Sequence, residues 1–181
     1  GALYKAQTNC AYWHGVFGGI YMHHLREAVY KNLIDADKLA DGNKALDIKE
    51  MDFYHREKNA LILEDNNFFV CIDPENGGAI RELDCKINSV NVVNTLARHK
   101  EAYHDKIIQK LNNRIIEPMK IYEAMKSVDV RIKRGIFYDR YLRACLVDHF
   151  IDKGLTQADF LDCNYADLGD FANGAYGVTI N

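Results

Sequence analysis

Three side chains near the start of the chain, Asn9, Trp13 and His14, have the chemistry of a small-molecule binding site. An indole ring offers a flat apolar face, and an imidazole or an amide can donate and accept hydrogen bonds. All three fall in residues 7–19, a run that also holds three of the twelve glycines. Aromatic residues more often fill protein cores than bind ligands. A core tryptophan at a glycine-rich helix start is therefore the competing interpretation, and residue types alone favour it.

The carboxylates that could act as an acid–base pair lack a spacing that would bring two of them together. Asp35 and Asp37 flank one end of a predicted helix, and Asp139, Asp148 and Asp170 lie in the second half of the chain. Most acidic side chains in folded proteins are exposed, so we interpret each as a solvated or capping group. We predict no catalytic pair in this chain.

Metal and cofactor sites are not predicted either. His23 and His24 are adjacent on a helical segment, so their side chains point about 100° apart and would not easily share one ion. The glycine pairs at 18–19 and 77–78 lack the lysine of a phosphate-binding loop. The cysteines are odd in number and contain no Cys-x-x-Cys pair, which favours reduced, mostly buried thiols. They are Cys10, Cys71, Cys85, Cys145 and Cys163.

The composition excludes several broad classes of protein. With 48% hydrophobic and 27% charged residues and two prolines, the chain is ordinary for a globular domain. A net charge of −3 gives no electrostatic reason to expect nucleic acid as a partner. No apolar run reaches the roughly 18 residues that a membrane helix needs, and the N-terminus lacks the apolar core of a signal peptide. We expect a cytoplasmic location and no membrane partner.

Hydrophobic spacing predicts a long amphipathic helix over about 12–40. Apolar residues recur every three or four positions from Phe17 to Ile34, and the turn-forming residues at 41–43 would end the helix. Residues 1–11 are predicted to be an extended or loop segment. Residues 43–58 are charged and are interpreted as a linker with one short strand.

From residue 60 onward the period changes to that of a sheet. Short runs of β-type residues alternate with turn residues, which predicts an antiparallel meander. The predicted strands cover 60–63, 68–72, 79–84, 86–88 and 90–93. The change near residue 59 divides the chain into two predicted domains, 1–58 and 59–181, and the fold class is α+β.

Several stretches together resemble one known family. Residues 9–19 (NCAYWHGVFGG) and the following HLR at 24–26 resemble a motif of the family-57 glycoside hydrolases, most closely the α-amylase/4-α-glucanotransferase group. The resemblance continues in the same order to the end of the chain. The matching stretches are GG at 77–78, ELD at 82–84, NTLAR at 94–98, EAYH at 101–104, YDRY at 138–141, DHF at 148–150 and LGDF at 168–171.

The resemblance implies an architecture and a reaction. Residues 1–58 would be the final helical segment of a barrel-type catalytic region, and residues 59–181 the first part of a galactose-mutarotase-like antiparallel β-sandwich. The family acts on α-1,4-glucan chains with retention, a reaction that needs two carboxyl groups about 5–5.5 Å apart. In the family both lie upstream of the Trp13–His14 motif, so this chain would be inactive alone and would depend on a catalytic barrel that it lacks.

The resemblance also gives Asn9, Trp13 and His14 a role as sugar contacts. Trp13 would stack on a pyranose ring of an α-glucan or maltooligosaccharide, while His14 and Asn9 would bond its hydroxyls. Relatives can carry an acid where this chain has Cys10, so no polar role is assigned there. For the EAYH stretch at 101–104 the resemblance implies an interdomain or sandwich role.

The order of the family also bears on the second half of the chain. Residues 98–126 have helical spacing. Residues 137–151 fit a helix and an extended chain equally, and the family order favours a strand. Residues 154–181 are predicted to be turns with an edge strand.

Two other functions remain open from the sequence alone. The chain would serve either as a non-catalytic carbohydrate-binding module or as a purely structural sandwich. If the apolar face of the first helix is exposed, it would also offer a homodimer contact through Val16, Ile20 and Leu25.

Overall fold

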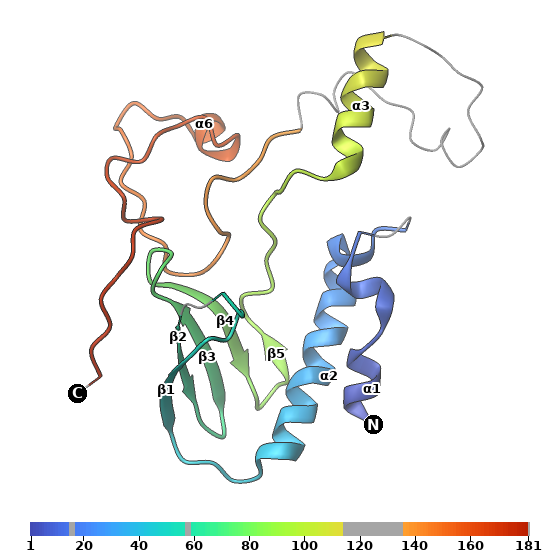
Figure 1. The fold of residues 1–181 in the computed structure, drawn as a ribbon, viewed down its shortest axis with the longest axis vertical. Coiled ribbons are helices and arrows are strands. Elements are labelled where there is room, and N and C mark those ends of the chain that lie inside the picture. Colours follow the sequence, from blue (N-terminus) through green and yellow to red (C-terminus); the bar gives the residue numbers. More distant parts are fainter. Residues whose placement is uncertain (15–16, 57–58, 114–135, 181) are drawn as a thin grey trace. The chain divides into compact units, whose positions relative to one another are not determined.

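The computed structural model describes residues 1–14, 17–56, 59–113 and 136–180. The chain forms two compact units (Figure 1). The first contains Gly1–Leu96, Tyr141–Asp152 and Ala166–Asn181, and the second contains Ala97–Arg140 and Lys153–Tyr165.

The N-terminal part of the first unit is helical, but its long helix starts later than predicted. Helix α1 (Ala2–Ala6) occupies a segment predicted to be extended, and two short 3-10 turns follow at Asn9–Tyr12 and Gly19–Tyr21. Helix α2 runs from His23 to Asp41. The predicted start at residue 12 was wrong because the backbone at Gly18 and Gly19 has positive φ angles of 111° and 52°, which a continuous right-handed helix cannot include.

Five strands follow as an antiparallel meander in the order β1-β2-β3-β4-β5 (Figure 1). Strands β2, β3 and β4 confirm the predicted runs at 60–63, 68–72 and 79–84, and β1 is the short strand predicted within 43–58 and pairs with β2. Strand β5 covers only the first two residues of the predicted run 90–93, and the predicted strand at 86–88 was wrong, because residues 86–89 form the turn between β4 and β5. Asp65 shapes the β2–β3 turn by accepting bonds from the backbone nitrogens of Asn67 and Phe68 at 2.7 and 2.8 Å. The strands are β1 Asp47–Met51, β2 Ala60–Glu64, β3 Phe68–Asp73, β4 Ala79–Cys85 and β5 Val90–Asn91.

One face of the sheet carries both an apolar cluster and a row of polar side chains. Ile62, Cys71 and Glu82 are cross-strand neighbours, and the first two are buried together with Ala60. Phe53, Tyr54 and Phe69 pack against this cluster. The next row on the same face is Glu64, Phe69, Asp84 and Asn91. An alternating strand places every second residue on this face, which explains the mixed character.

The last part of the first unit returns to the sheet without adding a regular strand. Ile80 and Cys145 form one isolated antiparallel bridge, and the Gly77 nitrogen donates to the Gly174 carbonyl at 2.8 Å. The extended chain favoured for 137–151 is thus reduced to a single bridge. The edge strand predicted within 154–181 was wrong, because the described residues 154–180 contain no strand and residues 157–161 are helical. The described strands form one sheet, so the α+β class holds.

The second unit is small and contains helices α3 (Ala102–Asn113) and α6 (Gln157–Leu161). Helix α3 confirms the predicted helical spacing as far as residue 113; residues 114–126 of that prediction lie outside the described residues. Arg98 and Asp139 are 41 residues apart in sequence but form an ion pair. The Arg98 side chain bonds the fully buried Asp139 carboxylate at 2.5 and 3.0 Å. Asp139 is therefore not the solvated group predicted, because a buried carboxylate requires a charged partner.

Candidate functional site

The structure places Trp13 and His14 together on the surface of the first unit. Their rings meet edge to face, with centroids 5.9 Å apart and planes at 69°. The Trp13 side chain is 47% exposed, so it is not a core residue. Asn9 is exposed at the first position of the 3-10 turn that ends just before Trp13. The short turn thus presents an aromatic face, an imidazole and an amide within one segment.

The backbone after this turn doubles back on Trp13. The Ile20 nitrogen donates to the Trp13 carbonyl at 2.9 Å, and the Tyr12 hydroxyl donates to the Ala6 carbonyl at 2.7 Å. A Cβ on Gly19 would lie 2.1 Å from the Trp13 carbonyl oxygen, well inside contact distance. Only glycine therefore permits this close approach.

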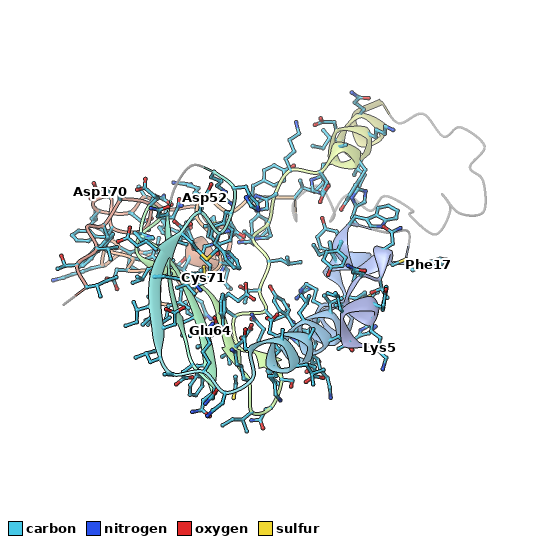
Figure 2. The ribbon with its side chains drawn as sticks, turned by 60° about the horizontal axis from the view of Figure 1, so that its bottom comes forward. Lys5, Phe17, Asp52, Glu64, Cys71 and Asp170 are labelled. Atoms are coloured by element: carbon cyan, nitrogen blue, oxygen red, sulfur yellow. The ribbon has the colours of Figure 1, made fainter. Side chains whose placement is uncertain are left out.

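Further aromatic side chains lie exposed in the same segment. Phe17 is 89% exposed, and Tyr12 and Tyr21 are about half exposed. Figure 2 labels Phe17 beside the N-terminal helices. Aromatic rings with one apolar face and a polar neighbour suit ligands that are themselves amphipathic. The group Tyr12, Trp13, His14, Phe17 and Tyr21 is called the aromatic segment below.

A second polar cluster, which the sequence reasoning missed, lies where the C-terminal part of α2 meets the sheet. Lys86 is only 3% exposed, and its ammonium contacts Glu64 at 2.7 Å and Asp41 at 3.3 Å. Lys44 contacts the other Glu64 oxygen at 2.6 Å. Burial alone would raise the pKa of Glu64, but the hydrogen bonds from Lys44 and Lys86 hold this pKa at about 2. Figure 2 labels Glu64 in the sheet.

The acids Glu82 and Asp84 form a third polar group on β4. Burial, reinforced by the neighbouring Asp84 charge, raises the pKa of Glu82 to about 8. Burial likewise raises the pKa of Asp84 to about 6, against the hydrogen bonds from Asn91 and Glu82. Glu82 therefore holds a proton at neutral pH and shares it with Asp84. The i, i+2 spacing of two acids in a predicted strand was the signal that could have revealed this pair.

The remaining predicted carboxylates and histidines take structural or surface positions. Ser89 donates to Asp35 at 2.5 Å, and Asp148 and Asp170 are exposed. His23 lies 3.8 Å from Glu27 on the exposed side of α2. Among the described residues, no group of three or more His, Cys, Asp or Glu side chains could hold a metal ion.

Two other sequence expectations can be compared with the structure. All five cysteines are free, which agrees with the predicted thiols, although Cys10 is exposed while Cys71 and Cys163 are buried. Within the described part of the chain, no helix is long and apolar enough to cross a membrane.

Comparison with known proteins identifies the family. Residues 57–181 match the model of the alpha-amylase/4-alpha-glucanotransferase C-terminal domain, and residues 1–40 match the middle domain of the same proteins. The chain belongs to the alpha-amylase/4-alpha-glucanotransferase family.

Individual relatives agree with this assignment. The chain is 39% identical to a 4-alpha-glucanotransferase of Thermococcus kodakarensis, over 98% of this chain and 27% of that protein. It is also 39% identical to an alpha-amylase of Pyrococcus abyssi, over 97% of this chain and 27% of that protein. The crystal structure of a 4-alpha-glucanotransferase from Thermococcus litoralis superposes with a TM-score of 0.79 at 34% identity, covering 99% of this chain and 24% of that one. The chain thus spans about a quarter of the length of these relatives.

Proposed function

We propose that the chain is the accessory part of an α-glucan-active glycoside hydrolase or glucanotransferase. Its relatives are named alpha-amylase and 4-alpha-glucanotransferase, and the chain corresponds to about a quarter of their length. In this proposal the catalytic carboxylates belong to a barrel that is not part of these 181 residues. Residues 1–58 supply one wall of the sugar subsites, and residues 59–181 form part of a β-sandwich-type accessory domain.

The observation that carries the proposal is the exposed pair Trp13 and His14. The apolar C–H face of a pyranose ring can stack on an indole that is 47% exposed. His14 lies beside the indole, where its ring nitrogens can exchange hydrogen bonds with sugar hydroxyls. Asn9 adds an amide on the preceding turn. None of these groups needs a metal or cofactor to bind a neutral sugar.

The apolar surface near the aromatic segment supports contact with a further protein domain. Leu3 and Tyr4 on α1 are 54% and 80% exposed, and Phe17 is also largely exposed. In the predicted homodimer contact, Ile20 and Leu25 are only half-exposed, and Val16 lies outside the described residues. Exposed apolar side chains in one neighbourhood favour an interface. We propose the catalytic barrel as the partner of this surface, with a second copy of the chain as the alternative.

A direct test is titration of the chain with maltooligosaccharides while the fluorescence of Trp13 is followed. Trp13 is the only tryptophan, so any signal reports this site. We expect a saturable change that is weakened about ten-fold or more in His14→Ala, which removes hydrogen bonds to the ligand. The exposed His99 provides the matched control, and His99→Ala should titrate like the parent chain.

The titration distinguishes a chain that contributes sugar contacts from one that is purely structural. Cellobiose, whose glucose units are β-linked, should give no saturable change at the same concentrations. If maltooligosaccharides up to millimolar concentration leave Trp13 fluorescence unchanged, the chain contributes no sugar contact alone, and the structural alternative is favoured.

A further inference from the structure

Arg26, at the end of the first turn of α2, joins the aromatic segment to the sheet. Its Nη1 donates to the Ile20 carbonyl at 2.6 Å. Its Nε donates to the Asn94 side-chain oxygen at 2.7 Å, and its Nη2 donates to the Asn94 carbonyl at 3.3 Å. One planar guanidinium thus bonds two segments that are 74 residues apart in sequence (94 − 20).

Each partner of Arg26 is fixed to a different element. The backbone nitrogen of Ile20 donates a hydrogen bond to the Trp13 carbonyl at 2.9 Å. A series of hydrogen bonds therefore runs from Arg26 through Ile20 to Trp13. Asn94 lies three residues after the end of β5: Val93 beside it is 5% exposed, and the Val92 nitrogen donates to the Leu83 carbonyl of β4 at 2.7 Å. The guanidinium therefore connects the backbone of Trp13 to the sheet.

The backbone of this segment needs such an external restraint. Gly18 and Gly19 lie between Trp13 and α2 with positive φ angles, and glycine has more accessible backbone conformations than any other residue. Charge-assisted hydrogen bonds from a rigid guanidinium are stronger and more directional than neutral ones. Lysine could not replace Arg26, because a single ammonium cannot form the same planar fork.

We propose that Arg26 is a positioning residue through which the sheet sets the orientation of Trp13 and His14. It contacts Ile20 and Asn94 and acts on the ligand through them. The coupling itself stands on the hydrogen bonds above, and only the identity of its ligand, an α-glucan, rests on the proposed function. The sheet then contributes directly to the geometry of the sugar subsite.

The test compares Arg26→Ala and Asn94→Ala in the full chain by acrylamide quenching and near-ultraviolet circular dichroism of Trp13. Release of the restraint should raise the quenching constant about two-fold, because a locally opened segment exposes the indole more fully. Asn94→Asp keeps the oxygen acceptors and should retain the parent signal. Arg81→Ala is the matched control, because Arg81 on β4 also makes a charge-assisted bond, to Asp73 of β3 at 3.0 Å, and its other neighbour, Tyr54, lies between β1 and β2.

The ligand titration adds a second readout. Both alanine variants should weaken maltooligosaccharide binding about ten-fold, as expected for loss of bonds to a charged group. Unchanged Trp13 quenching in a folded Arg26→Ala chain would overturn the coupling, as would an equal change in Arg81→Ala. If Arg26→Ala fails to fold, Asn94→Ala decides. If quenching changes as expected but the parent chain binds no sugar, the coupling stands and the proposed function falls.

Discussion

Asn91 lies directly opposite Asp84 across the β4–β5 ladder, and its side-chain nitrogen donates to the Asp84 carboxylate at 2.7 Å. Both side chains are buried, and within the described residues the amide oxygen of Asn91 has no hydrogen-bond partner. An amide nitrogen stabilises the ionised form of its acceptor. The proton of the acidic pair therefore resides on Glu82, whose pKa is raised to about 8 by burial and by the Asp84 charge.

This arrangement predicts a loss of stability as the pH rises. A folded-state pKa above the unfolded value contributes stability that is complete below the unfolded pKa and is lost as the pH rises through the folded pKa. For Glu82 that range extends from about 4.5 to about 8. Urea unfolding at pH 5, 7 and 9 should show a total loss of about 4 kcal/mol between pH 5 and pH 9. Glu82→Gln, which mimics the protonated acid, should flatten this dependence.

The exposed Glu50 on β1 supplies the control for the pH experiment. Glu50→Gln should keep the slope of the parent chain, because no buried carboxyl is changed. Glu64 has the opposite sign: its pKa is lowered to about 2, so the stability that it contributes is lost as the pH falls toward that value. A Glu82→Gln chain with the parent slope between pH 5 and 9 would show that the buried proton lies elsewhere.

Replacement of the buried Lys86 should strongly destabilise the folded chain. Lys86→Met would leave Glu64 and Asp41 without the buried ammonium that lies 2.7 and 3.3 Å from them. Breaking one side of a buried ion pair costs about 3–5 kcal/mol. We expect a loss near the lower end, since Lys44 still bonds Glu64. Urea unfolding at pH 7 measures it.

Lys49 on β1 is the control for this ion-pair prediction. It contacts Asp47 at 3.1 Å, with both side chains more than 40% exposed. Surface ion pairs of this kind contribute about 0–1 kcal/mol, so Lys49→Met should unfold close to the parent midpoint. Equal losses for both lysine variants would contradict the role assigned to burial.

Gly19→Ala should disturb the aromatic segment itself. The new Cβ would lie 2.1 Å from the Trp13 carbonyl oxygen, so the backbone between them must move. Gly42→Ala is the matched control, because Gly42 has a similar φ of 64° but open space where a Cβ would go. Both variants bear backbone strain of about 1–3 kcal/mol, but only Gly19→Ala should alter the near-ultraviolet spectrum of Trp13. An unaltered spectrum would mean that the close approach is dispensable.

Much of the sheet was predictable because its signals are local. Residues 60–64 alternate in burial as a strand does, and the turn at Asp65 carries its own hydrogen-bond acceptor. The start of α2 was not predictable from periodicity, because apolar residues at helical spacing also fit the two 3-10 turns. Only the positive φ angles at Gly18 and Gly19 separate them from the helix.

The candidate site was predictable only in part. Trp13 and His14 follow each other in sequence, so their contact needs no tertiary information. The bond between Arg26 and Asn94 depends on how α2 packs against β5, and no local pattern encodes that distance. The same holds for Asp139, which looks like a surface acid until Arg98 is placed beside it. Pairings across the chain are where residue-by-residue interpretation fails.

Strand β1 has a consequence for how the molecule behaves at high concentration. It is an edge strand of the described sheet, and four of its five residues are exposed, including Ile48 and Met51. Such an edge can recruit a strand from another molecule. Lys49 and Glu50 place opposite charges at its centre, where an incoming strand would have to desolvate them. These two charges therefore oppose edge-to-edge association of sheets in crowded preparations.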